Sequence, residues 1–462
     1  MADLKNGAVI LAGGEGKRMK SSMPKAMCEV LFKPMISWVL DSVERSEAGD
    51  VCVITGHLHE KLEEYIGDRC KTYEQKERLG TGHAVMQARE FIENHSGNIL
   101  VLNGDAPLMD SETIRDALEY HINFDNAVTV ISARVPDPTG YGRIVRDSNG
   151  TLLCITEQAD ASEEVKKINE VNSGAYWFKS DVLLGMLDKI KPDNAQGEYY
   201  LTDAIKLALK EKMRAAAYTA KNPNVVLGAN DRVQLLELNE IVRKDVLKRL
   251  MLEGVDIPCT DGIIISPEVE VLRDTKILPN TIITGKTKIG SGCVIGPNSK
   301  IDSCTVGDNT ILKNVDAEKS EIGSGVDAGP FVHVRPDSKV ADKVHLGNFV
   351  EIKNSVIGEG TKVSHLTYIG DCDVGKGVNF GCGCVVVNYN GKSKNRTTIA
   401  DNAFIGCNTN LISPVNVGEM GYTAAGSTIY KDVPAKSLAI ERSKQENIEG
   451  WVDRKKPYKN MQ

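Results

Sequence analysis

Several features that mark particular classes of protein are missing from this 462-residue chain. It has no apolar run long enough to cross a bilayer, so we expect no membrane-spanning helix. The opening residues, MADLKNG, contain no signal-peptide core. The 11 cysteines form no Cys-x-x-Cys zinc pair and, without an export signal, are expected to be reduced thiols. We therefore expect a cytoplasmic protein.

The chain also lacks the positive charge that nucleic-acid binders carry. Its net charge is −7, and the only basic patch is the short run Arg454, Lys455 and Lys456 near the end. What is present is ordinary for a globular protein, with 41% hydrophobic and 26% charged residues. The length predicts at least two domains.

The most informative stretch is Ala8 to Lys25, AVILAGGEGKRMKSSMPK. A short, unpatterned apolar run is typical of a strand that is buried on both faces. The glycines that follow allow a sharp turn with free N–H groups, which can surround an anion. Arg18 and Lys25 add positive charge at close range. The residues alone predict a phosphate or nucleotide loop at the end of the first strand.

Two common phosphate motifs do not fit this loop. It has no Gly-Lys-Ser/Thr of a P-loop, and Met19 stands where the last glycine of a dinucleotide fingerprint belongs. A plain glycine turn is the alternative. However, Leu-Ala-Gly-Gly-Glu-Gly-Lys-Arg-Met with Pro24-Lys25 resembles the signature of sugar-nucleotide pyrophosphorylases.

Residues 1–229 alternate between strand-like and helix-like stretches, which predicts a parallel sheet with helices on both faces. The predicted strands after the first are Val51–Thr55, Ile99–Leu102, Ala127–Ala133 and Ala175–Phe178. The predicted helices are Met35–Glu44, Gly82–Glu93, Glu112–His121 and Leu201–Lys210. In such sheets ligands bind at the carboxyl ends of the strands.

Polar motifs fall at these expected strand ends. Gln75 precedes Leu79-Gly80-Thr81-Gly82, a turn that opens a helix and suits a base edge or a phosphate. The equally plausible alternative is that Thr81 only caps the helix. Asn103-Gly104-Asp105 follows a strand directly, and we favour Asp105 as a Mg²⁺ ligand over a simple turn former. Asn230 is a possible second oxygen ligand.

The chain then changes pattern twice. Apolar residues recur at three- and four-residue spacing over Arg232–Glu253, at Leu235, Leu238, Val242, Val246 and Leu250. This single apolar stripe predicts a helix that connects two domains. A helix that binds a partner is the less favoured alternative. From about residue 261, apolar residues recur every six positions, as in Ile277, Ile283, Ile289, Ile295 and Ile301. This period predicts a solenoid of short strands, a parallel β-helix of hexapeptide repeats. The predicted domains are residues 1–229, a linker at 230–253, and residues 254–462.

For the coils from Ile277 to Ile322 we expect a purely structural role, whereas the later coils carry unusual polar residues. His365 follows Arg335 and Lys353 and precedes Tyr368, which makes it a candidate general base. The gap between Val386 and Ile399 predicts an extruded loop around Asn388-Tyr389-Asn390-Gly391-Lys392.

Taken in order, these residues resemble the family of bifunctional N-acetylglucosamine-1-phosphate uridyltransferases and glucosamine-1-phosphate acetyltransferases. Hexapeptide-repeat acyltransferases imply a left-handed β-helix and a homotrimer with active sites between subunits. The resemblance implies Mg²⁺ on Asp105 and Asn230, and it assigns Lys25 and Arg18 to charge stabilisation. Residues implied to contact the sugar nucleotide are Leu11, Ala12, Gly14, Lys25, Gln75, Gly80, Thr81, Asn103, Gly104, Gly140, Glu157, Asn172 and Asn230.

In the second half the resemblance implies His365 as the base. It assigns Arg335, Lys353, Tyr368 and Asn379 to the sugar phosphate, and acetyl-CoA to Cys382, Asn388, Tyr389, Cys407, Ala425 and Arg442. Four positions depart from the family's usual residues: Asn103 for Tyr, Cys382 for Ala, Cys407 for Ser, and Asn390 for Asp.

The implied function is the synthesis of UDP-N-acetylglucosamine, a bacterial cell-envelope precursor, from glucosamine-1-phosphate, acetyl-CoA and UTP. Two alternatives stay open. One is a single-activity pyrophosphorylase whose β-helix assembles or regulates, against which His365 with Asn388-Tyr389 speaks. The other is an inactive sensor or scaffold, against which the set of Lys25, Asp105 and Asn230 speaks.

Overall fold

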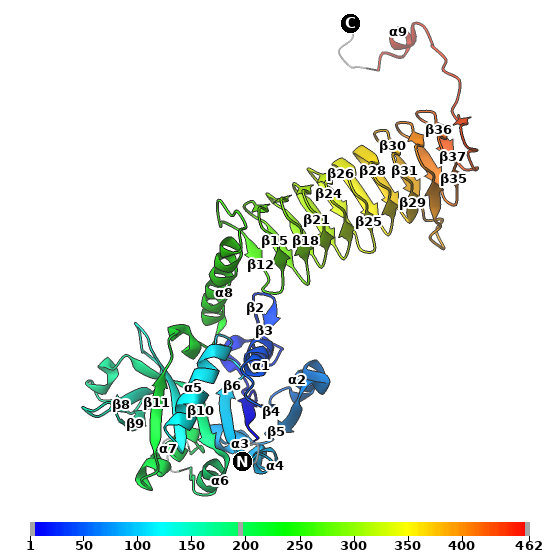
Figure 1. Ribbon diagram of the computed structural model, residues 1–462. Helices are drawn as coiled ribbons and strands as arrows, with labels where there is room; N and C mark the ends of the chain where they lie inside the picture. Colours follow the sequence, from blue (N-terminus) through cyan, green and yellow to red (C-terminus); the bar gives the residue numbers. More distant parts are fainter. Residues whose placement is uncertain (1–4, 193–196, 458–462) are drawn as a thin grey trace. The chain divides into compact units, whose positions relative to one another are not determined.

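The computed structural model describes residues 5–192 and 197–457 and divides the chain into two compact units, residues 1–242 and 243–462 (Figure 1). The division falls inside helix α8 (Arg232–Leu252), which corresponds to the predicted connecting helix. No helix in the described ranges is long and apolar enough to cross a membrane.

The first unit is built on a twisted sheet with the strand order β11-β7-β10-β6-β1-β4-β5 and a β8–β9 hairpin paired to β10. Its strands are β1 Gly7–Leu11, β2 Glu29–Val30, β3 Lys33–Pro34, β4 Asp50–Thr55, β5 Lys71–Glu74, β6 Asn98–Asn103, β7 Val128–Arg134, β8 Arg143–Arg146, β9 Leu152–Thr156, β10 Glu170–Lys179 and β11 Ala215–Thr219. Its helices are α1 Met35–Arg45, α2 His59–Ile66, α3 Thr81–Gln87, α4 Arg89–Glu93, α5 Ser111–Asn123, α6 Ser180–Leu187 and α7 Leu201–Lys210.

Both faces of this sheet are covered, as the unpatterned apolar run in β1 predicts. Ala8 and Ile10 pack in one core with α1 and α5, whereas Val9 packs in the other with α3, α4, α6 and α7. Burial on both faces explains why Ala8 to Leu11 shows no alternation of polar and apolar residues.

Two details of the predicted first unit are wrong. Strand β10 contains the predicted Ala175–Phe178 but runs antiparallel to both β6 and β7. The β8–β9 hairpin follows β7, and Val171 at the start of β10 pairs with Arg143 of β8, so β10 enters the sheet from the end at which β7 leaves it. The predicted single helix Gly82–Glu93 is two helices, because the chain breaks at Ala88 between α3 and α4.

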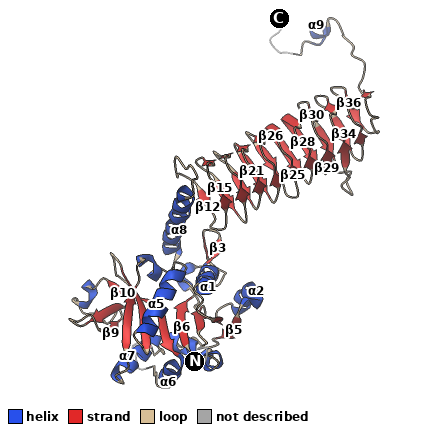
Figure 2. Cartoon of the chain, viewed as in Figure 1, coloured by secondary structure: helices blue, strands red, loops and turns tan. Residues whose placement is uncertain are grey.

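The second unit is a parallel β-helix of short strands that stack coil upon coil (Figure 2). The pairing of these strands forms three columns. Paired residues lie 18 positions apart in the first coils, as in Ile264 with Ile282 and Glu270 with Lys288, so three six-residue repeats make one coil. The isoleucines from Ile277 to Ile301 at intervals of six are buried in the coil interior. The predicted hexapeptide solenoid is thereby confirmed.

The strands of the three columns are as follows. The first holds β12 Ile264–Ile265, β15 Ile282–Thr284, β18 Lys300–Asp302, β21 Val315–Glu318, β24 Val332–Val334, β31 Val385–Val387, β34 Asn410–Ile412 and β37 Thr428–Ile429. The second holds β14 Lys276–Ile277, β17 Val294–Ile295, β20 Ile311–Leu312, β23 Asp327–Ala328, β30 Asn379–Phe380, β33 Phe404–Ile405, β36 Tyr422–Thr423 and β38 Leu438–Ala439. The third holds β13 Glu270–Val271, β16 Lys288–Ile289, β19 Thr305–Val306, β22 Glu321–Ile322, β25 Lys339–Val340, β27 Val356–Ile357, β29 Cys372–Val374, β32 Thr397–Ile399 and β35 Asn416–Val417.

Two longer strands, β26 (His345–Lys353) and β28 (Lys362–Gly370), bend around a corner and so belong to both the first and the second column. The bends fall at Phe349 and Leu366, whose φ angles are 58° and 45°. The predicted loop is also present: β31 ends at Val387, β32 begins at Thr397, and Tyr389 between them is exposed. The chain ends with the short helix α9 (Trp451–Lys455).

Candidate functional sites

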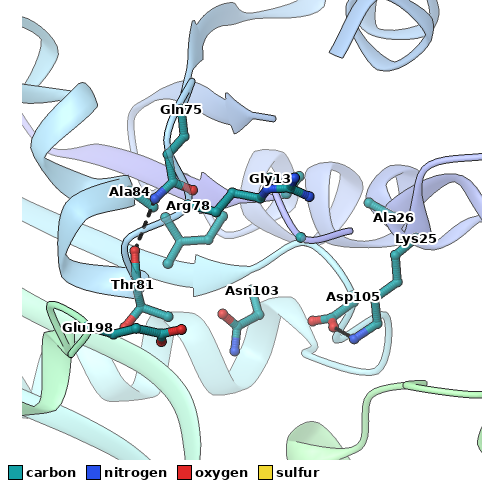
Figure 3. A pocket seen from close by; sticks show the side chains of 14 residues that line it. Gly13, Lys25, Ala26, Gln75, Arg78, Thr81, Ala84, Asn103, Asp105 and Glu198 are labelled. Atoms are coloured by element: carbon teal, nitrogen blue, oxygen red, sulfur yellow. Dashed lines mark hydrogen bonds and ion pairs between the residues drawn. The ribbon is translucent and has the colours of Figure 1, made fainter. Parts of the chain in front are cut away.

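A cavity of about 340 Å³ opens in the first unit beside the glycine turn that follows β1 (Figure 3). Nine of the predicted site residues line it. These are Leu11, Ala12, Gly14, Lys25, Gln75, Gly80, Thr81, Asn103 and Asp105. Most of them follow the ends of β1, β5 and β6 or stand at the start of α3, as expected for a ligand site in an open α/β sheet, and Lys25 begins a short 3-10 helix, Lys25–Met27.

The turn is held in a fixed shape. Gly16 has a φ of 61°, and a Cβ atom on it would lie 2.8 Å from Cβ of Lys25, so any larger residue would push Lys25 away. Gln75 donates a hydrogen bond from Nε2 to the Gly80 carbonyl at 3.1 Å, and its Oε1 would lie 3.2 Å from a Cβ atom on Gly13, so this side chain lies between the two glycine-containing loops. The cavity walls are therefore formed before any ligand enters.

Lys25 lies between the two predicted metal ligands. Its Nζ donates to Oδ1 of Asn230 at 2.7 Å and forms an ion pair with Oδ2 of Asp105. The two oxygens therefore converge on one cation-sized point at the edge of the cavity. A carboxylate and an amide oxygen suit Mg²⁺, which takes its remaining ligands from water and substrate phosphates. The donor set fits the predicted ion, provided that Lys25 leaves this position.

Thr81 does not cap its helix, so that alternative is wrong. Helix α3 begins at Thr81 after Gly80, and no side chain caps it. Oγ1 of Thr81 instead accepts a hydrogen bond from the Leu201 N–H at 3.0 Å, which fixes the start of α7. In the first turn of α3, the Gly82 N–H donates to the Tyr199 carbonyl at 2.7 Å, so the start of this helix is tied to the segment that precedes α7.

A second group of predicted residues lies on the β8–β9 hairpin and β10. The Asn172 N–H donates to the Gly142 carbonyl at 2.8 Å, and Gly140 donates to Oε1 of Gln158 at 3.2 Å. A Cβ on Gly142 would lie 3.3 Å from both carboxylate oxygens of Glu157. The structure thus brings together Gly140, Glu157 and Asn172, although they do not line the first cavity.

Asn103 connects the two groups. Its amide lies directly against Gly174, where a Cβ would come within 2.4 Å of Nδ2, and Asn172 accepts a hydrogen bond from the Gly174 N–H at 3.0 Å. Burial raises the pKa of Glu157 above its usual range, aided by Asp160 and Asp203 and opposed by Lys206. This wall of the site therefore presents a poorly hydrated carboxyl and an amide.

Two further predicted residues, Arg18 and Gly104, do not line the cavity. Arg18 is exposed, and Gly104 packs between Ala12 and Ile36 with its N–H bound to the Leu11 carbonyl at 2.9 Å. Arg78 does line the cavity and donates to Glu15 at 3.0 Å across the glycine turn. Sequence reasoning missed Arg78, although it stands three residues after Gln75.

Sequence reasoning also missed Ala26, Ala84 and Glu198 in the cavity wall. Glu198 is brought there because its neighbour Tyr199 pairs with the other loop: the Tyr199 N–H donates to Leu79 and the Tyr199 carbonyl accepts from Gly82, both at 2.7 Å. Its sequence neighbours carry no motif that would have identified it.

In the second unit, three of the four predicted sugar-phosphate ligands, Arg335, Lys353 and Tyr368, form one group, whereas Asn379 lies on β30 (Asn379–Phe380) at another corner. Arg335 donates to Glu351 at 3.0 Å, and Lys353 pairs with Asp371 at 3.4 Å. Asp371 is buried, which alone would raise its pKa. Hydrogen bonds from Asn354 and Asn388 and the charge of Lys353 outweigh burial, so the pKa of Asp371 lies below its usual range. Asp371 is an organising residue that sequence reasoning missed.

Tyr368 and Asn388 complete this group. The Nδ2 of Asn388 lies 3.4 Å from the Tyr368 hydroxyl, and both side chains occupy the space beside Gly370. The extruded loop also brings Lys394 against Lys353, and this contact lowers the pKa of Lys394. Lys394 is a further cation of the group that was missed, although it stands just beyond the predicted loop residues.

The other predicted residues form a column at a different corner of the β-helix. Asn348 pairs with His365, and the register continues through Cys382 and Cys407 to Ala425. Nη1 of Arg442 donates to the Ala425 carbonyl at 2.7 Å, which closes the column. His365 is exposed at its start, and Asn379 stands on β30 three residues before Cys382. We call His365, Cys382, Cys407 and Ala425 the thiol column.

Two family models match the two units separately. The Nucleotidyl transferase family model matches residues 7–224, and the Bacterial transferase hexapeptide model matches residues 268–303. A solved structure titled as a UDP-glucose pyrophosphorylase complexed with UDP-glucose matches 52% of this chain and 99% of its own, at 18% identity and a TM-score of 0.44.

Curated relatives match over nearly the whole length. A bifunctional protein GlmU of Clostridium botulinum is 48% identical over 97% of this chain and 98% of its own. That of Caldanaerobacter subterraneus is 48% identical over 96% and 97%, and that of Acetivibrio thermocellus is 48% identical over 97% and 97%. The predicted resemblance to a bifunctional uridyltransferase and acetyltransferase family is confirmed, and the chain belongs to the family of bifunctional GlmU proteins.

Proposed function

We propose that the chain makes UDP-N-acetylglucosamine in two steps, one in each unit, and that the residues described above carry those steps. The observation that carries this proposal is the separation of two polar groups. Lys25, Asp105 and Asn230 stand beside a nucleotide-sized cavity in the first unit, whereas the thiol column and the Arg335–Lys353 group stand on the β-helix. Each group suits one of the two reactions.

In the acetyl transfer, the amine of glucosamine-1-phosphate attacks the thioester carbonyl of acetyl-CoA and the thiolate of CoA leaves. His365 takes the amine proton as general base. Arg335, Lys353 and Lys394 hold the sugar phosphate, and Tyr368 and Asn379 orient the sugar. Asn388, which the resemblance alone assigns to acetyl-CoA, lies against Tyr368 and Asp371 and therefore orients the sugar as well. Acetyl-CoA lies along Cys382, Cys407 and Ala425 towards Arg442, with Tyr389 of the extruded loop at its edge.

In the uridylyl transfer, a phosphate oxygen of N-acetylglucosamine-1-phosphate attacks the α-phosphorus of UTP and pyrophosphate leaves. Gln75, Gly80 and Thr81 bind the uridine, while Glu157 and Asn172 with Gly140 bind the sugar. Lys25 turns from Asp105 to the phosphates, where its charge offsets the charge that develops in the transition state. Mg²⁺, held by Asp105 and Asn230, supplies charge neutralisation of the phosphate oxygens when bound.

We also propose that the active form is a homotrimer in the cytoplasm. Phe331, Phe349 and Leu366 form an apolar ridge beside His365 and are 55%, 56% and 58% exposed on the single chain. The rings of Phe331 and Phe349 stack at 5.2 Å. Moreover, His365 and the Arg335–Lys353 group stand at different corners of the β-helix. A neighbouring subunit packed on this ridge would bring its own Arg335–Lys353 group towards His365 and so complete the acetyl-transfer site.

One assay tests both steps. The chain is given glucosamine-1-phosphate, acetyl-CoA, UTP and Mg²⁺, and the release of CoA and of pyrophosphate is followed separately. We expect CoA first and pyrophosphate after it. Supplying N-acetylglucosamine-1-phosphate instead should release pyrophosphate without acetyl-CoA. Release of pyrophosphate with no CoA release under any condition would favour the single-activity alternative.

A further inference from the structure

Two cysteines occupy matching positions on successive coils of the thiol column. Strand β30 pairs with β33 so that Asn379 faces Phe404 and Phe380 faces Ile405. The register continues past the strand ends, because the Asn408 N–H donates to the Cys382 carbonyl at 2.7 Å. Cys382 therefore stands directly beside Cys407, although 25 residues separate them in the sequence.

The backbone on the two coils has the same local shape. The residues after the cysteines, Gly383 and Asn408, both have left-handed φ angles, 77° and 54°. Neighbouring paired strands lie about 4.8 Å apart, which is inside the range of about 4.4–6.8 Å for the Cα atoms of a disulfide. The two side chains thus leave the β-helix from equivalent points at a distance that a disulfide spans.

The thiol of Cys407 already leans towards the coil of Cys382. A Cβ atom on Gly381 would lie 2.5 Å from the backbone N of Cys407 and 2.8 Å from its Sγ, so the Cys407 sulfur lies against Gly381 on the coil of Cys382. Cys407 is exposed and Cys382 is partly exposed, and both are free thiols. Both can therefore meet a dissolved reagent.

The third nearby cysteine is placed differently. Sγ of Cys384 points into the coil and donates to the carbonyls of Gly381 at 3.0 Å and Gly406 at 3.1 Å. Burial raises its pKa to about 11, which leaves little thiolate at neutral pH. Cys384 should therefore react with neither the disulfide nor the alkylating reagent in the folded chain, and it serves as a control for the accessibility of its neighbours.

We propose that Cys382 and Cys407 are a redox modification site that forms a reversible disulfide by exchange with a low-molecular-weight disulfide. The thiolate of Cys407 attacks one sulfur of the reagent, breaks its S–S bond and releases one thiolate. Cys382 then attacks the sulfur of Cys407 and releases the second thiolate. The chain loses two electrons and two protons, and the reagent is reduced to two thiols.

This site acts on the acetyl transfer and in that respect rests on the proposed function. The two cysteines lie between His365 and Ala425, where the acetyl-CoA chain is proposed to run. A disulfide there draws the two sulfurs together and removes both S–H donors from the wall of the site. Acetyl transfer then falls while uridylyl transfer, which uses the first unit, continues.

The test is made on the wild-type chain in glutathione buffers of increasing oxidised fraction. Free thiols are alkylated, and peptide mass spectrometry quantifies the cross-link between the peptides of Cys382 and Cys407. We expect this cross-link to form first, acetyl transfer to fall in proportion to it, and a dithiol reductant to reverse both. The double variant Cys382→Ala, Cys407→Ser should transfer acetyl groups at its own reduced rate in every buffer, whatever that rate is, whereas Cys70→Ser should lose acetyl transfer on oxidation as the wild type does.

Two results would overturn the proposal. One is alkylation of both cysteines at every buffer ratio, or only mixed disulfides with glutathione. The other is a complete cross-link with unchanged acetyl transfer. Failure of the proposed function is distinguishable, because the fully reduced chain would then release no CoA from acetyl-CoA, whereas the mass-spectrometric result needs no activity.

Discussion

Lys25 and Asn230 are 205 residues apart in the sequence and share a hydrogen bond of 2.7 Å at the edge of the cavity in the first unit. Because Lys25 also pairs with Asp105, one ammonium holds both residues that are proposed to bind Mg²⁺. The same three groups therefore have two arrangements available, one held by Lys25 and one held by the metal with Lys25 turned to the phosphates.

The first prediction follows from this relationship. Asp105→Asn removes the only carboxylate of the three and should lower pyrophosphate release by about a hundredfold or more, since metal-borne charge stabilisation is worth several kcal/mol. CoA release should stay at the wild-type rate, which serves as the internal control for folding. Wild-type uridylyl transfer by this variant at saturating Mg²⁺ would contradict the assignment of Asp105.

The second prediction concerns Glu157, whose pKa is raised chiefly by burial. A carboxyl with a raised folded-state pKa contributes stability below its unfolded pKa, near 4.3, and that contribution is lost as pH rises through the folded pKa. Glu157→Gln should therefore unfold at a higher temperature than wild type at neutral pH, with the gain disappearing below about pH 4.

The same variant should lose function. If Glu157 accepts a hydrogen bond from the sugar, Glu157→Gln should raise the KM for N-acetylglucosamine-1-phosphate about tenfold or more, because a hydrogen bond to a charged group is worth about 1.5–3 kcal/mol. The KM for UTP should change little. Higher stability with an unchanged KM would show that Glu157 is only a buried structural carboxyl.

The third prediction concerns assembly. Phe349→Asp places a charge in the apolar ridge beside His365, where burial of a Phe side chain is worth about 1.5–3 kcal/mol. The variant should sediment as a smaller species and lose acetyl transfer while keeping uridylyl transfer. Tyr430→Asp, an equally exposed aromatic on the β-helix, is the matched control and should keep the assembly. A wild-type chain that sediments as a monomer and transfers acetyl groups would refute the trimer.

The sequence could predict those features whose pattern is contained in one short stretch of the chain. Two such patterns are the six-residue spacing from Ile277 to Ile301 and the apolar run of β1. In both, the residues that make up the pattern are the ones that the fold buries. The loop after Val387 was visible as a gap in the repeat. In these segments the local pattern and the tertiary structure agree.

The residues that were missed depend on contacts between distant segments. Asp371 matters because Asn354, Asn388 and Lys353 converge on it from other coils, and Glu198 reaches the cavity only because Tyr199 pairs with Leu79. The direction of β10 was also missed, since Ala175–Phe178 reads the same in a parallel or an antiparallel strand. Such features depend on which distant segments pair in the folded chain, and no single stretch of sequence contains that information.

The last prediction tests the separation of the two sites and the identity of the base together. His365→Ala should lower acetyl transfer by about 10²–10⁴, the usual cost of losing a general base. Uridylyl transfer from N-acetylglucosamine-1-phosphate should survive, because the polar group around Lys25 lies in the other compact unit.

The pH profile distinguishes a base from a structural residue at this position. The defect of His365→Ala should shrink as pH rises, because more of the substrate amine is then deprotonated without help, whereas a defect in packing or assembly would not follow the amine. Both activities are measured across pH on the purified variant, with its assembly checked by sedimentation and Asn348→Ala, one coil earlier in the same register, as the control. Full acetyl transfer at neutral pH would remove His365 as the base, and loss of both activities in an intact assembly would refute the independence of the two sites.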